Sequence, residues 1–146
     1  MAYNTLGFAF TGLRILSFAV IESAYKKSGE VNLMTALGYG LDVEKHIVSC
    51  NAKFAFEKKK GQPFLILEVQ SQFQIENKDF LKKIKQNKNS YLITKDLAIH
   101  FAVLTIGSAR GILHAKTEGT EFNEYLLPTI DVNAIVQEDV IFEFSD

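Results

Sequence analysis

The side chains that could bind a metal ion or act as a nucleophile are few and far apart in this sequence. His100 and His114 fall in one predicted helix, where a rise of 1.5 Å per residue separates them by about 21 Å. Histidines at that distance cannot share a metal ion within one chain, and structural roles explain them better. Cys50 lies on the apolar face of a predicted strand, about 13 Å along it from His46. We therefore expect no catalytic residue, no metal site and no cofactor.

Two local motifs that often contact phosphates lack the required context. The glycines of residues 107–111, GSARG, fall inside the predicted helix, whereas a phosphate-binding loop places its glycines before a helix with free amides. Five lysines between residues 78 and 88 form a basic segment. Phe80 is the one aromatic residue among them, although stacking on bases uses interleaved aromatic rings. With a net charge of −1, we expect no nucleic-acid partner.

Length and composition indicate one domain over residues 1–146, since 47% of the residues are apolar and 23% are charged. The one cysteine excludes an internal disulfide and fits a reducing compartment. The first apolar stretch lacks a preceding positive charge and is interrupted by Arg14, so it is a poor secretory signal. The longest apolar run, residues 97–109, is too short to span a bilayer. We expect a cytoplasmic protein that is not inserted in a membrane.

Alternating apolar side chains predict an antiparallel hairpin over residues 46–75. In its first strand the core positions are Val48, Cys50, Ala52, Phe54 and Phe56, and in its second strand they are Leu65, Leu67, Val69, Phe73 and Ile75. Phe64 and Ile66 are predicted to face away from the core. A turn at residues 58–63 joins the strands, where Gly61 permits a positive φ.

The segments on either side of the hairpin are less regular. Residues 13–25 predict a further strand, with Leu16, Phe18 and Val20 on one face. Residues 26–43 contain three glycines and predict a crossing loop with a short extended piece at residues 31–34. Residues 76–90 are polar and basic, which predicts a loop with a helical turn around residues 80–84.

A long helix is predicted from about Lys95 to Lys116, with Thr94 as its N-cap and Gly119 as its stop. Apolar side chains cover two sides of this helix, whereas one sheet can bury only one side. We therefore expect a homo-oligomer with this helix at the interface; the proposed interface residues are Leu97, Phe101, Leu104 and Ser108. A short second helix is predicted over residues 132–142, although the alternation of residues 140–144 is also compatible with a strand.

Residues 119–135 combine large apolar side chains with Pro128, which is incompatible with a helix interior or a central strand. Two interpretations stay open for Phe122, Tyr125 and Leu127. They either form an exposed apolar patch with a binding function or cover the core under the end of the long helix.

The order of these elements and several short motifs resemble the SecB family of export chaperones. Leu67-Glu68-Val69-Gln70 is similar to the centre of the last long strand in that family, and residues 13–18, LRILSF, are similar to its opening strand. Thr117-Glu118-Gly119-Thr120 resembles the end of its long helix, and Leu126-Leu127-Pro128 resembles the Leu-x-Pro turn that follows. The resemblance covers most of residues 13–142. It implies an α+β fold with a four-stranded antiparallel sheet, a long helix and a short second helix.

This resemblance also implies a function without chemistry. Members of the family assemble as a dimer of dimers through their long helices and hold unfolded polypeptides in apolar grooves. They pass these clients to SecA, and some relatives serve one antitoxin of a toxin–antitoxin system. The groove positions correspond to Val31, Leu33, Phe122, Tyr125 and Leu127 in this sequence. Ile66 and Glu68 match two positions of the SecA-docking surface, whereas Ala19 stands where an acidic residue is expected.

An alternative from another class is an enzyme that acts on acyl thioesters. A curved antiparallel sheet around one apolar helix is also the architecture of hot-dog-type enzymes. In those proteins the central helix comes early and most strands follow it, whereas here the predicted strands come first. Asp96 is the one carboxylate on the predicted helix, in a first-turn position where an acid stabilises the helix end. The expected function is therefore a chaperone and not an enzyme.

Overall fold

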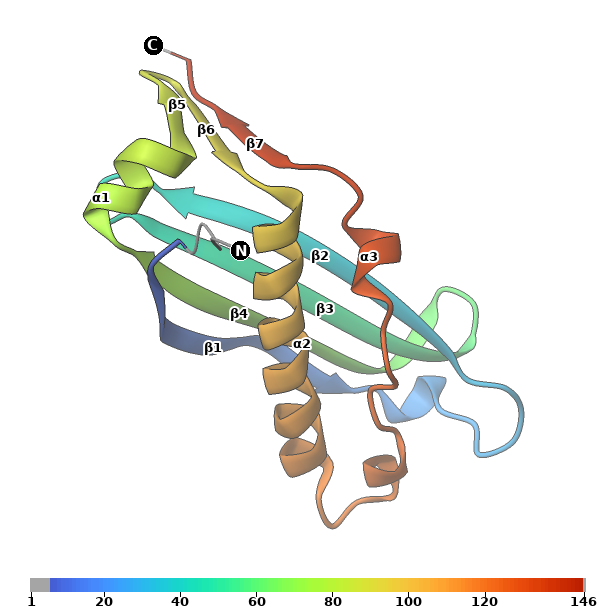
Figure 1. The fold of residues 1–146 in the computed structure, drawn as a ribbon. Helices are drawn as coiled ribbons and strands as arrows, with labels where there is room; N and C mark the ends of the chain where they lie inside the picture. The colour runs from blue at the N-terminus through green and yellow to red at the C-terminus, as the bar shows by residue number, and fades with distance from the viewer. Residues whose placement is uncertain (1–5, 146) are drawn as a thin grey trace.

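Four long antiparallel strands form the main sheet of the structure, a computed structural model that describes residues 6–145. The strands are β1 (Phe8–Val20), β2 (Asn32–Asp42), β3 (Ile47–Lys59) and β4 (Gln62–Ile75). Their order in space is β1-β4-β3-β2, so β1 and β2 are the two edges of the sheet (Figure 1). The connection between these edges, residues 21–31, contains a short 3-10 turn, η1 (Glu22–Ala24).

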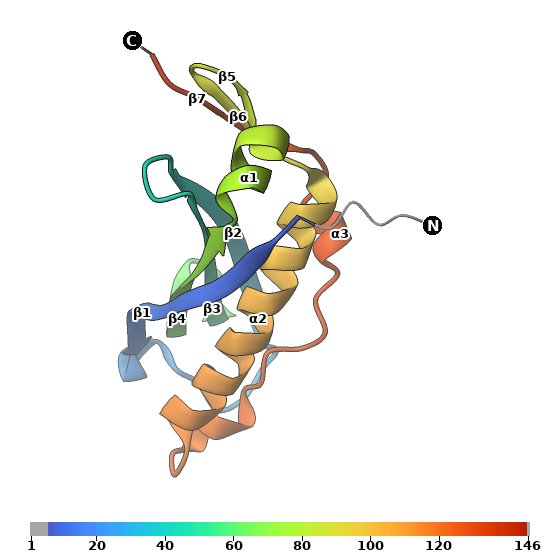
Figure 2. The same ribbon diagram turned by 60° about the vertical axis from the view of Figure 1, so that its left-hand side comes forward.

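A long helix, α2 (Lys95–Thr117), follows the sheet and crosses one of its faces. Figure 2 shows α2 on one side of the strands, and within residues 6–145 no helix covers the opposite side. A 3-10 turn, η3 (Glu121–Glu124), and a short helix, α3 (Val132–Ile135), come next. The predicted α+β fold, a four-stranded antiparallel sheet followed by a long helix and a short second helix, is therefore confirmed.

The ends of α2 lie where the sequence predicts them. Leu97 donates its backbone N–H to the side-chain oxygen of Thr94 at 3.3 Å. Gly119 follows the helix with a φ of 81°, a conformation that glycine adopts without steric cost. By length and composition alone, α2 would also pass for a membrane-spanning helix. One side of α2 is nevertheless buried on the sheet, and the core helices of globular proteins have the same composition.

The hairpin predicted over residues 46–75 is present as β3 and β4, with Gly61 at a φ of 81° in its turn. All of the side chains that were predicted to face the core from these two strands are buried. The prediction that Phe64 faces away from the core was wrong. Phe56 pairs with Leu65 and Glu57 pairs with Pro63, so Phe64 is the extra residue of a β-bulge. The bulge allows Phe64 and Leu65, which are consecutive in the strand, to be buried together.

Strand β1 starts and ends earlier than the strand predicted over residues 13–25. Its register with β4 shifts at two places, which puts bulges at Thr11 and Leu16. The prediction that Leu16 shares a face with Phe18 was wrong because the bulge interrupts the alternation. By register, Leu13 and Ile15 face the side that carries α2, yet 44% and 42% of these two residues are exposed. The helix therefore leaves part of β1 uncovered.

Strand β2 is complete over 11 residues, where the sequence analysis predicted a crossing loop. From Ala36 to Leu41 its side chains alternate between small and large. The odd-numbered residues lie on the side of the core, as their pairing with β3 shows; they are Leu33, Thr35, Leu37, Tyr39 and Leu41. Ala36, Gly38 and Gly40 lie between them on the opposite face. The error arose because two glycines indicate a loop by composition, whereas β3 provides a partner that holds them in a strand.

A second, smaller sheet lies beside the N-terminal end of α2 (Figure 1). It contains β5 (Lys85–Asn87), β6 (Ser90–Ile93) and β7 (Val140–Glu143), in that spatial order. The predicted helical turn is present as α1 (Asn77–Asp79) and a π-helical turn, η2 (Phe80–Ile84). The second helix is shorter than predicted, because residues 140–143 pair with β6 and form a strand.

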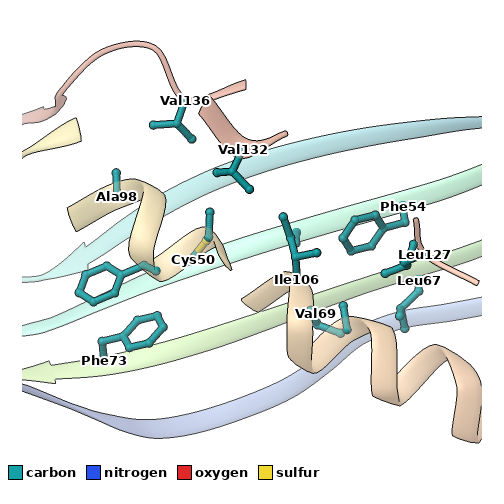
Figure 3. Close-up of a cluster of buried hydrophobic side chains, with 14 of the residues drawn as sticks. Cys50, Phe54, Leu67, Val69, Phe73, Ala98, Ile106, Leu127, Val132 and Val136 are labelled. Carbon is teal, nitrogen blue, oxygen red and sulfur yellow. The ribbon is translucent and has the colours of Figure 1, made fainter. Parts of the chain in front are cut away.

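The core lies between the main sheet and α2 (Figure 3). Phe73 of β4 and Phe101 of α2 stack with ring centroids 4.1 Å apart. The side of α2 that contacts the sheet also carries small buried residues, Ala98, Ala102 and Ala109. Small side chains let the helix backbone approach the strands closely, and each buried apolar group stabilises the fold by about 25 cal/mol per Å² removed from water.

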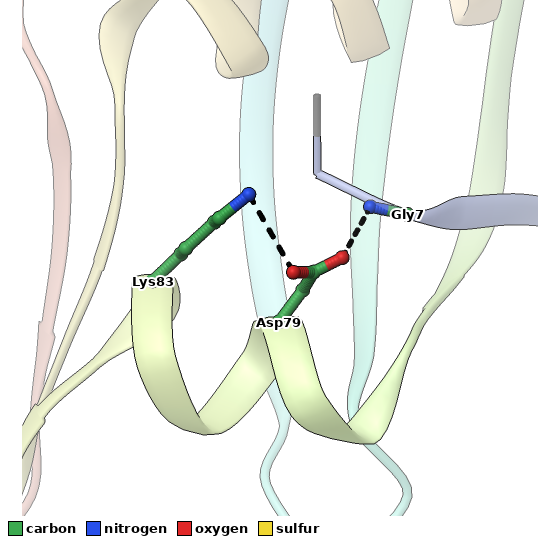
Figure 4. Close-up of polar contacts among 3 residues, drawn as sticks. All are labelled: Gly7, Asp79 and Lys83. Carbon is green, nitrogen blue, oxygen red and sulfur yellow. Dashed lines mark hydrogen bonds and ion pairs between the residues drawn. The ribbon is translucent and has the colours of Figure 1, made fainter. Parts of the chain in front are cut away.

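The start of β1 is held by one carboxylate (Figure 4). Gly7 donates its backbone N–H to Asp79 at 2.7 Å, and Lys83 forms an ion pair with the same side chain at 3.5 Å. The Gly7 hydrogen bond and then the Lys83 charge lower the pKa of Asp79 below its usual value. Because Asp79 lies in α1, this contact connects the first residues of the edge strand to the turn that follows β4.

Candidate binding groove

A groove with a volume of about 300 Å³ lies between β2 and the chain that follows α3. One wall is formed by Leu37 and Tyr39 on the core side of β2, and the other by residues 135–138 and Val140. The walls combine aliphatic and aromatic surface with the polar side chains of Gln137 and Glu138. Such a mixed lining can contact apolar side chains through Leu37, Tyr39 and Val136 and polar groups through Gln137 and Glu138.

The position of each wall has a structural cause. Tyr39 donates its hydroxyl to the backbone oxygen of Ala98 at 2.6 Å, which fixes the ring of Tyr39 under the first turn of α2. On the other wall, Asp139 accepts the backbone N–H of Lys95 at 2.7 Å. The pairing of β7 with β6 then continues this wall into the smaller sheet. Both walls are therefore attached to the N-terminal end of α2, and the groove has a defined width.

Exposed apolar side chains occur on both walls' elements near this groove. Met34 on the outer face of β2 is 57% exposed, and Ile135 on the opposite wall is 41% exposed. Val31, immediately before β2, is also exposed. Ile135 lines the groove, whereas Met34 points to the opposite face of the sheet. Scattered exposed apolar residues of this kind are normal on a protein surface.

The structure separates the five positions predicted to bind clients into two groups. Val31 and Leu33 lie at the start of β2, on the strand that forms the groove. Phe122 and Leu127 are buried in the core, so in this conformation they present no surface to a client. Of the two interpretations left open for these two residues, the structure therefore supports the core-covering one. Arg110 contributes to this arrangement by donating from Nε to the backbone oxygen of Leu127 at 3.0 Å.

Tyr125 has an intermediate position in an aromatic cluster at the other end of the sheet. The rings of Tyr25 and Phe122 lie 4.9 Å apart, and the rings of Phe64 and Tyr125 lie 5.0 Å apart. The hydroxyls of Tyr25 and Tyr125 are hydrogen-bonded at 3.0 Å. Burial, followed by this hydrogen bond, raises the pKa of Tyr125 above its usual value. The cluster joins the connection between β1 and β2 to the segment after α2, which contains Pro128.

The residues predicted to form an oligomer interface are not equally available. Phe101 is fully buried against the sheet, so its assignment to an interface was wrong; the helix turns this side chain toward Phe73. Leu97, Leu104 and Ser108 are half-buried. The outer surface of α2 also carries Val103, which is 50% exposed. An apolar strip of α2 therefore remains accessible, although it is narrower than predicted.

Ile66 and Glu68 lie side by side on the face of the sheet opposite α2, as the register predicts. Glu68 is opposite Ser17 on β1 and opposite Lys53 on β3. The surrounding surface is rich in amides, and the side chain of Gln70 donates to that of Asn51 at 3.0 Å. Glu68 is therefore surrounded by neutral or basic neighbours, as the missing acid at Ala19 suggested.

The residues examined for chemistry are dispersed in the structure. Within residues 6–145, no three histidine, cysteine, aspartate or glutamate side chains gather closely enough to hold a metal ion. Cys50 is buried, and burial raises the pKa of its thiol above the usual value. The ring of His46 stacks on Phe80 with centroids 4.1 Å apart. These contacts are structural.

Leu37, Tyr39 and the wall over residues 135–140 were not predicted from the sequence as site residues. The alternation of large and small residues in β2 was present in the sequence and could have revealed the first wall. The second wall had no comparable signal, because its position depends on pairing between β6 and β7, which are distant in sequence.

No protein-family model matches this chain, and no curated protein sequence matches it. One similar solved structure is that of the Mycobacterium tuberculosis Rv1957 SecB-like chaperone in complex with a ChAD peptide from the Rv1956 HigA1 antitoxin. The sequence identity is 11%, the match covers 84% of this chain and 90% of that chain, and the TM-score is 0.49. We draw no functional conclusion from a likeness at this level.

Proposed function

We propose that this chain is a holding chaperone that binds apolar segments of unfolded or aggregation-prone polypeptides. The observation that carries this proposal is the groove between β2 and residues 135–140, whose walls include Leu37, Tyr39 and Val136 and which runs beside an open edge of the sheet. A groove for unfolded chains needs apolar walls that tolerate many sequences, and aromatic and aliphatic side chains provide them. Each contact of a few side chains is weak at about 25 cal/mol per Å², but several contacts add up along one client.

Within this proposal, Val31 and Leu33 extend the groove toward the start of β2, and Tyr125 contributes at the aromatic cluster. The clients are either proteins destined for export or one dedicated client such as an antitoxin. A dedicated client is the better match to the outer face of the sheet. SecA docking through Ile66 and Glu68 would need an acidic partner for Glu68 on β1, and β1 provides none there. A cytoplasmic location suits Cys50, which a reducing compartment keeps as a thiol.

The proposal includes self-association of the chain. Two surfaces carry accessible apolar side chains: the uncovered part of β1, with Leu13 and Ile15, and the outer side of α2, with Leu104 and Val103. Both surfaces contain aliphatic side chains that a second copy would remove from water. A dimer of dimers built on these two surfaces would place several grooves on one particle, which increases the avidity for a long client.

Capture of an unfolded protein tests the proposed function. A chemically unfolded, slow-folding protein is diluted into the chain, and light scattering reports both the mass of the complex and the suppression of aggregation. We expect a stable complex with the unaltered chain, clearly weaker capture with Ile135→Asp in the groove wall, and unchanged capture with Met34→Asp on the opposite face of the sheet. Both side chains are exposed, so these variants should fold normally. Leu81→Asp is a second control, because Leu81 is also exposed but lies on η2, away from the groove. Equal capture by all variants would contradict the groove assignment.

The enzyme alternative finds less support in the fold. The four strands of the main sheet precede α2, which is the reverse of the order expected for a hot-dog-type enzyme. Asp96 is exposed in the first turn of α2 and faces no cleft among those described. Hydrolysis of acyl thioesters by the purified chain, together with no capture of unfolded protein, would favour the enzyme instead.

A further inference from the structure

We propose that a bound client segment adds to the main sheet as a fifth strand, in extended conformation, along the free edge of β2. This inference rests on the proposed function and specifies how the client is held. The affinity would then come from main-chain hydrogen bonds to β2, and the groove would select the side chains.

The backbone groups at this edge point outward and are unpaired. Ile75 on β4 donates its N–H to the backbone oxygen of His46, just before β3, at 2.9 Å. Bonded and non-bonded pairs alternate along an antiparallel ladder, and the pairing of β3 with β4 is continuous from Ile47 to Phe56. Odd-numbered residues of β3 therefore direct their N–H and C=O groups to β2.

Through the register of β2 with β3, the even-numbered residues of β2 receive those bonds. The odd-numbered residues direct their N–H and C=O groups to the free edge; they are Leu33, Thr35, Leu37, Tyr39 and Leu41. Within residues 6–145, no other backbone group is hydrogen-bonded to these five residues from outside the sheet. The edge therefore offers a row of donors and acceptors for one more strand.

Nothing in the sequence of β2 protects this edge against pairing. Proteins usually protect an open edge with a charge, a proline or a bulge. Residues 32–41, NLMTALGYGL, contain no charged residue and no proline. The register with β3 is uninterrupted from Asn32 to Asp42. A long, regular and uncharged edge strand is a pairing surface, and a chaperone has a use for such a surface.

The groove determines which segments fit. In an added strand, alternate side chains point toward the α2 side of the sheet, where Leu37, Tyr39 and Val136 line the groove. The remaining side chains point toward Ala36 and Gly38, where there is space. Glu138 at the rim disfavours acidic residues by charge repulsion. The expected ligand is an extended segment with apolar residues at every second position and no acidic residues.

Backbone N-methylation separates main-chain from side-chain recognition. The probe is a synthetic peptide of alternating valine and serine with a lysine at each end. Two variants carry N-methyl groups, one on every valine and one on every serine. In an antiparallel addition, each residue of the added strand points its side chain to the same face as the β2 residue directly opposite. The valines in the groove therefore lie opposite the odd-numbered residues of β2, and their amides form the hydrogen bonds to β2. We expect valine methylation to weaken binding at least about 100-fold, because several hydrogen bonds are lost, and serine methylation to leave the affinity nearly unchanged.

The outcomes distinguish this inference from the proposed function. If both methylated peptides bind as well as the unmethylated peptide, strand addition is wrong and the groove binds side chains alone. If serine methylation alone weakens binding, the strand adds in parallel and the inference stands. If the unmethylated peptide fails to bind and unfolded protein is also not captured, the proposed function fails as well.

A proline variant tests the same inference from the side of the protein. Thr35→Pro removes one N–H that points to the free edge, and a proline is tolerated at such an edge position. Thr11→Pro in β1 is the matched control at the opposite edge. Circular dichroism verifies that both variants are folded. We expect Thr35→Pro to weaken binding of the unmethylated peptide about tenfold, whereas Thr11→Pro leaves it unchanged. Equal affinities in the two folded variants would overturn the assignment to β2.

Discussion

The two edges of the main sheet, β1 and β2, differ in every property that controls strand pairing. β1 has bulges at Thr11 and Leu16 and a charge at Arg14, so its backbone does not offer a regular row of hydrogen-bonding groups. β2 pairs with β3 without interruption and carries no charge before Asp42. β1 instead exposes apolar side chains on the face that α2 leaves uncovered.

Under the proposed function, this difference corresponds to two kinds of partner. Side chains dominate the surface at β1, and a second folded copy of fixed shape can cover such a surface. Main-chain groups dominate the edge of β2, and any extended segment can pair with them, whatever its sequence. One sheet can in this way combine an edge for assembly with an edge for clients.

Truncation of Phe122, which packs on the connection between the two edge strands, should have the largest effect on stability. Phe122 packs against Tyr25, which lies in the connection from β1 to β2. Phe122→Ala should lower the free energy of unfolding by about 3–5 kcal/mol, the range for a buried aromatic side chain. Chemical denaturation measures this value. A change below about 1 kcal/mol would show that the aromatic cluster is not part of the core.

Acid should loosen β1 before β2. The pKa of Asp79 is lowered by the Gly7 hydrogen bond and the Lys83 charge, so its contribution is complete above the ordinary aspartate pKa of about 4. That contribution is lost as the pH falls through the lowered value. Hydrogen exchange on a series toward low pH should show the start of β1 opening before β2. Asp79→Asn should produce the same opening at neutral pH; protection that is equal at both edges would contradict this role.

The tyrosine pair should have a moderate effect. Tyr25→Phe removes one hydrogen bond to Tyr125 but keeps the ring, and the expected loss is about 1 kcal/mol. Thermal unfolding followed by circular dichroism measures the difference. Tyr25→Ala is the comparison, because it also removes the ring contacts and should cost clearly more.

Substitution of one glycine at each edge should change the free energy of unfolding least. A Cβ atom added at Gly38 in β2 meets no atom within 4 Å, whereas one added at Gly12 in β1 lies 2.7 Å from the side-chain oxygen of Gln72 and 3.2 Å from its Cβ. Gly38→Ala should therefore stabilise the fold by about 0.4–1 kcal/mol by restricting the unfolded chain. Gly12→Ala should destabilise it, because the Gln72 side chain must move. Equal midpoints in urea would refute this difference between the edges.

Local patterns predicted the parts of the fold that local contacts determine. Val48 to Phe56 alternate because one face of β3 is buried, and Thr94 caps α2 through a residue three positions away. The hairpin and the long helix were therefore predictable from the sequence.

The errors occurred where distant partners determine the structure. Phe64 is turned inward by a bulge whose position depends on pairing with β3. Residues 140–143 form a strand because β6, far away in the sequence, is adjacent in space. In β2, the small residues Gly38 and Gly40 concealed a strand that β3 stabilises from outside.

The candidate site was predictable only in part, for the same reason. The resemblance put Val31 and Leu33 in a loop that binds clients, whereas Leu33 lies in β2 and Val31 immediately before it; their role in binding stays a prediction. Phe122 and Leu127 were matched to groove positions by resemblance, while the irregular, apolar segment with Pro128 left exposure and core burial equally open. The aromatic cluster and the Arg110 hydrogen bond bury this segment without any regular secondary structure, and sequence periodicity does not detect burial of that kind.

The attachment of the groove wall to β7 has a consequence for the order of events during synthesis. The ribosome makes β2 early, whereas residues 135–143 emerge after the sheet and α2 are complete. While the chain grows, the uncharged edge of β2 is therefore exposed without its wall, and it can pair with the edges of neighbouring nascent chains. The protein that we propose to protect other polypeptides from aggregation would itself be most prone to aggregate in this interval. Its yield should accordingly depend on how quickly translation passes from α2 to β7.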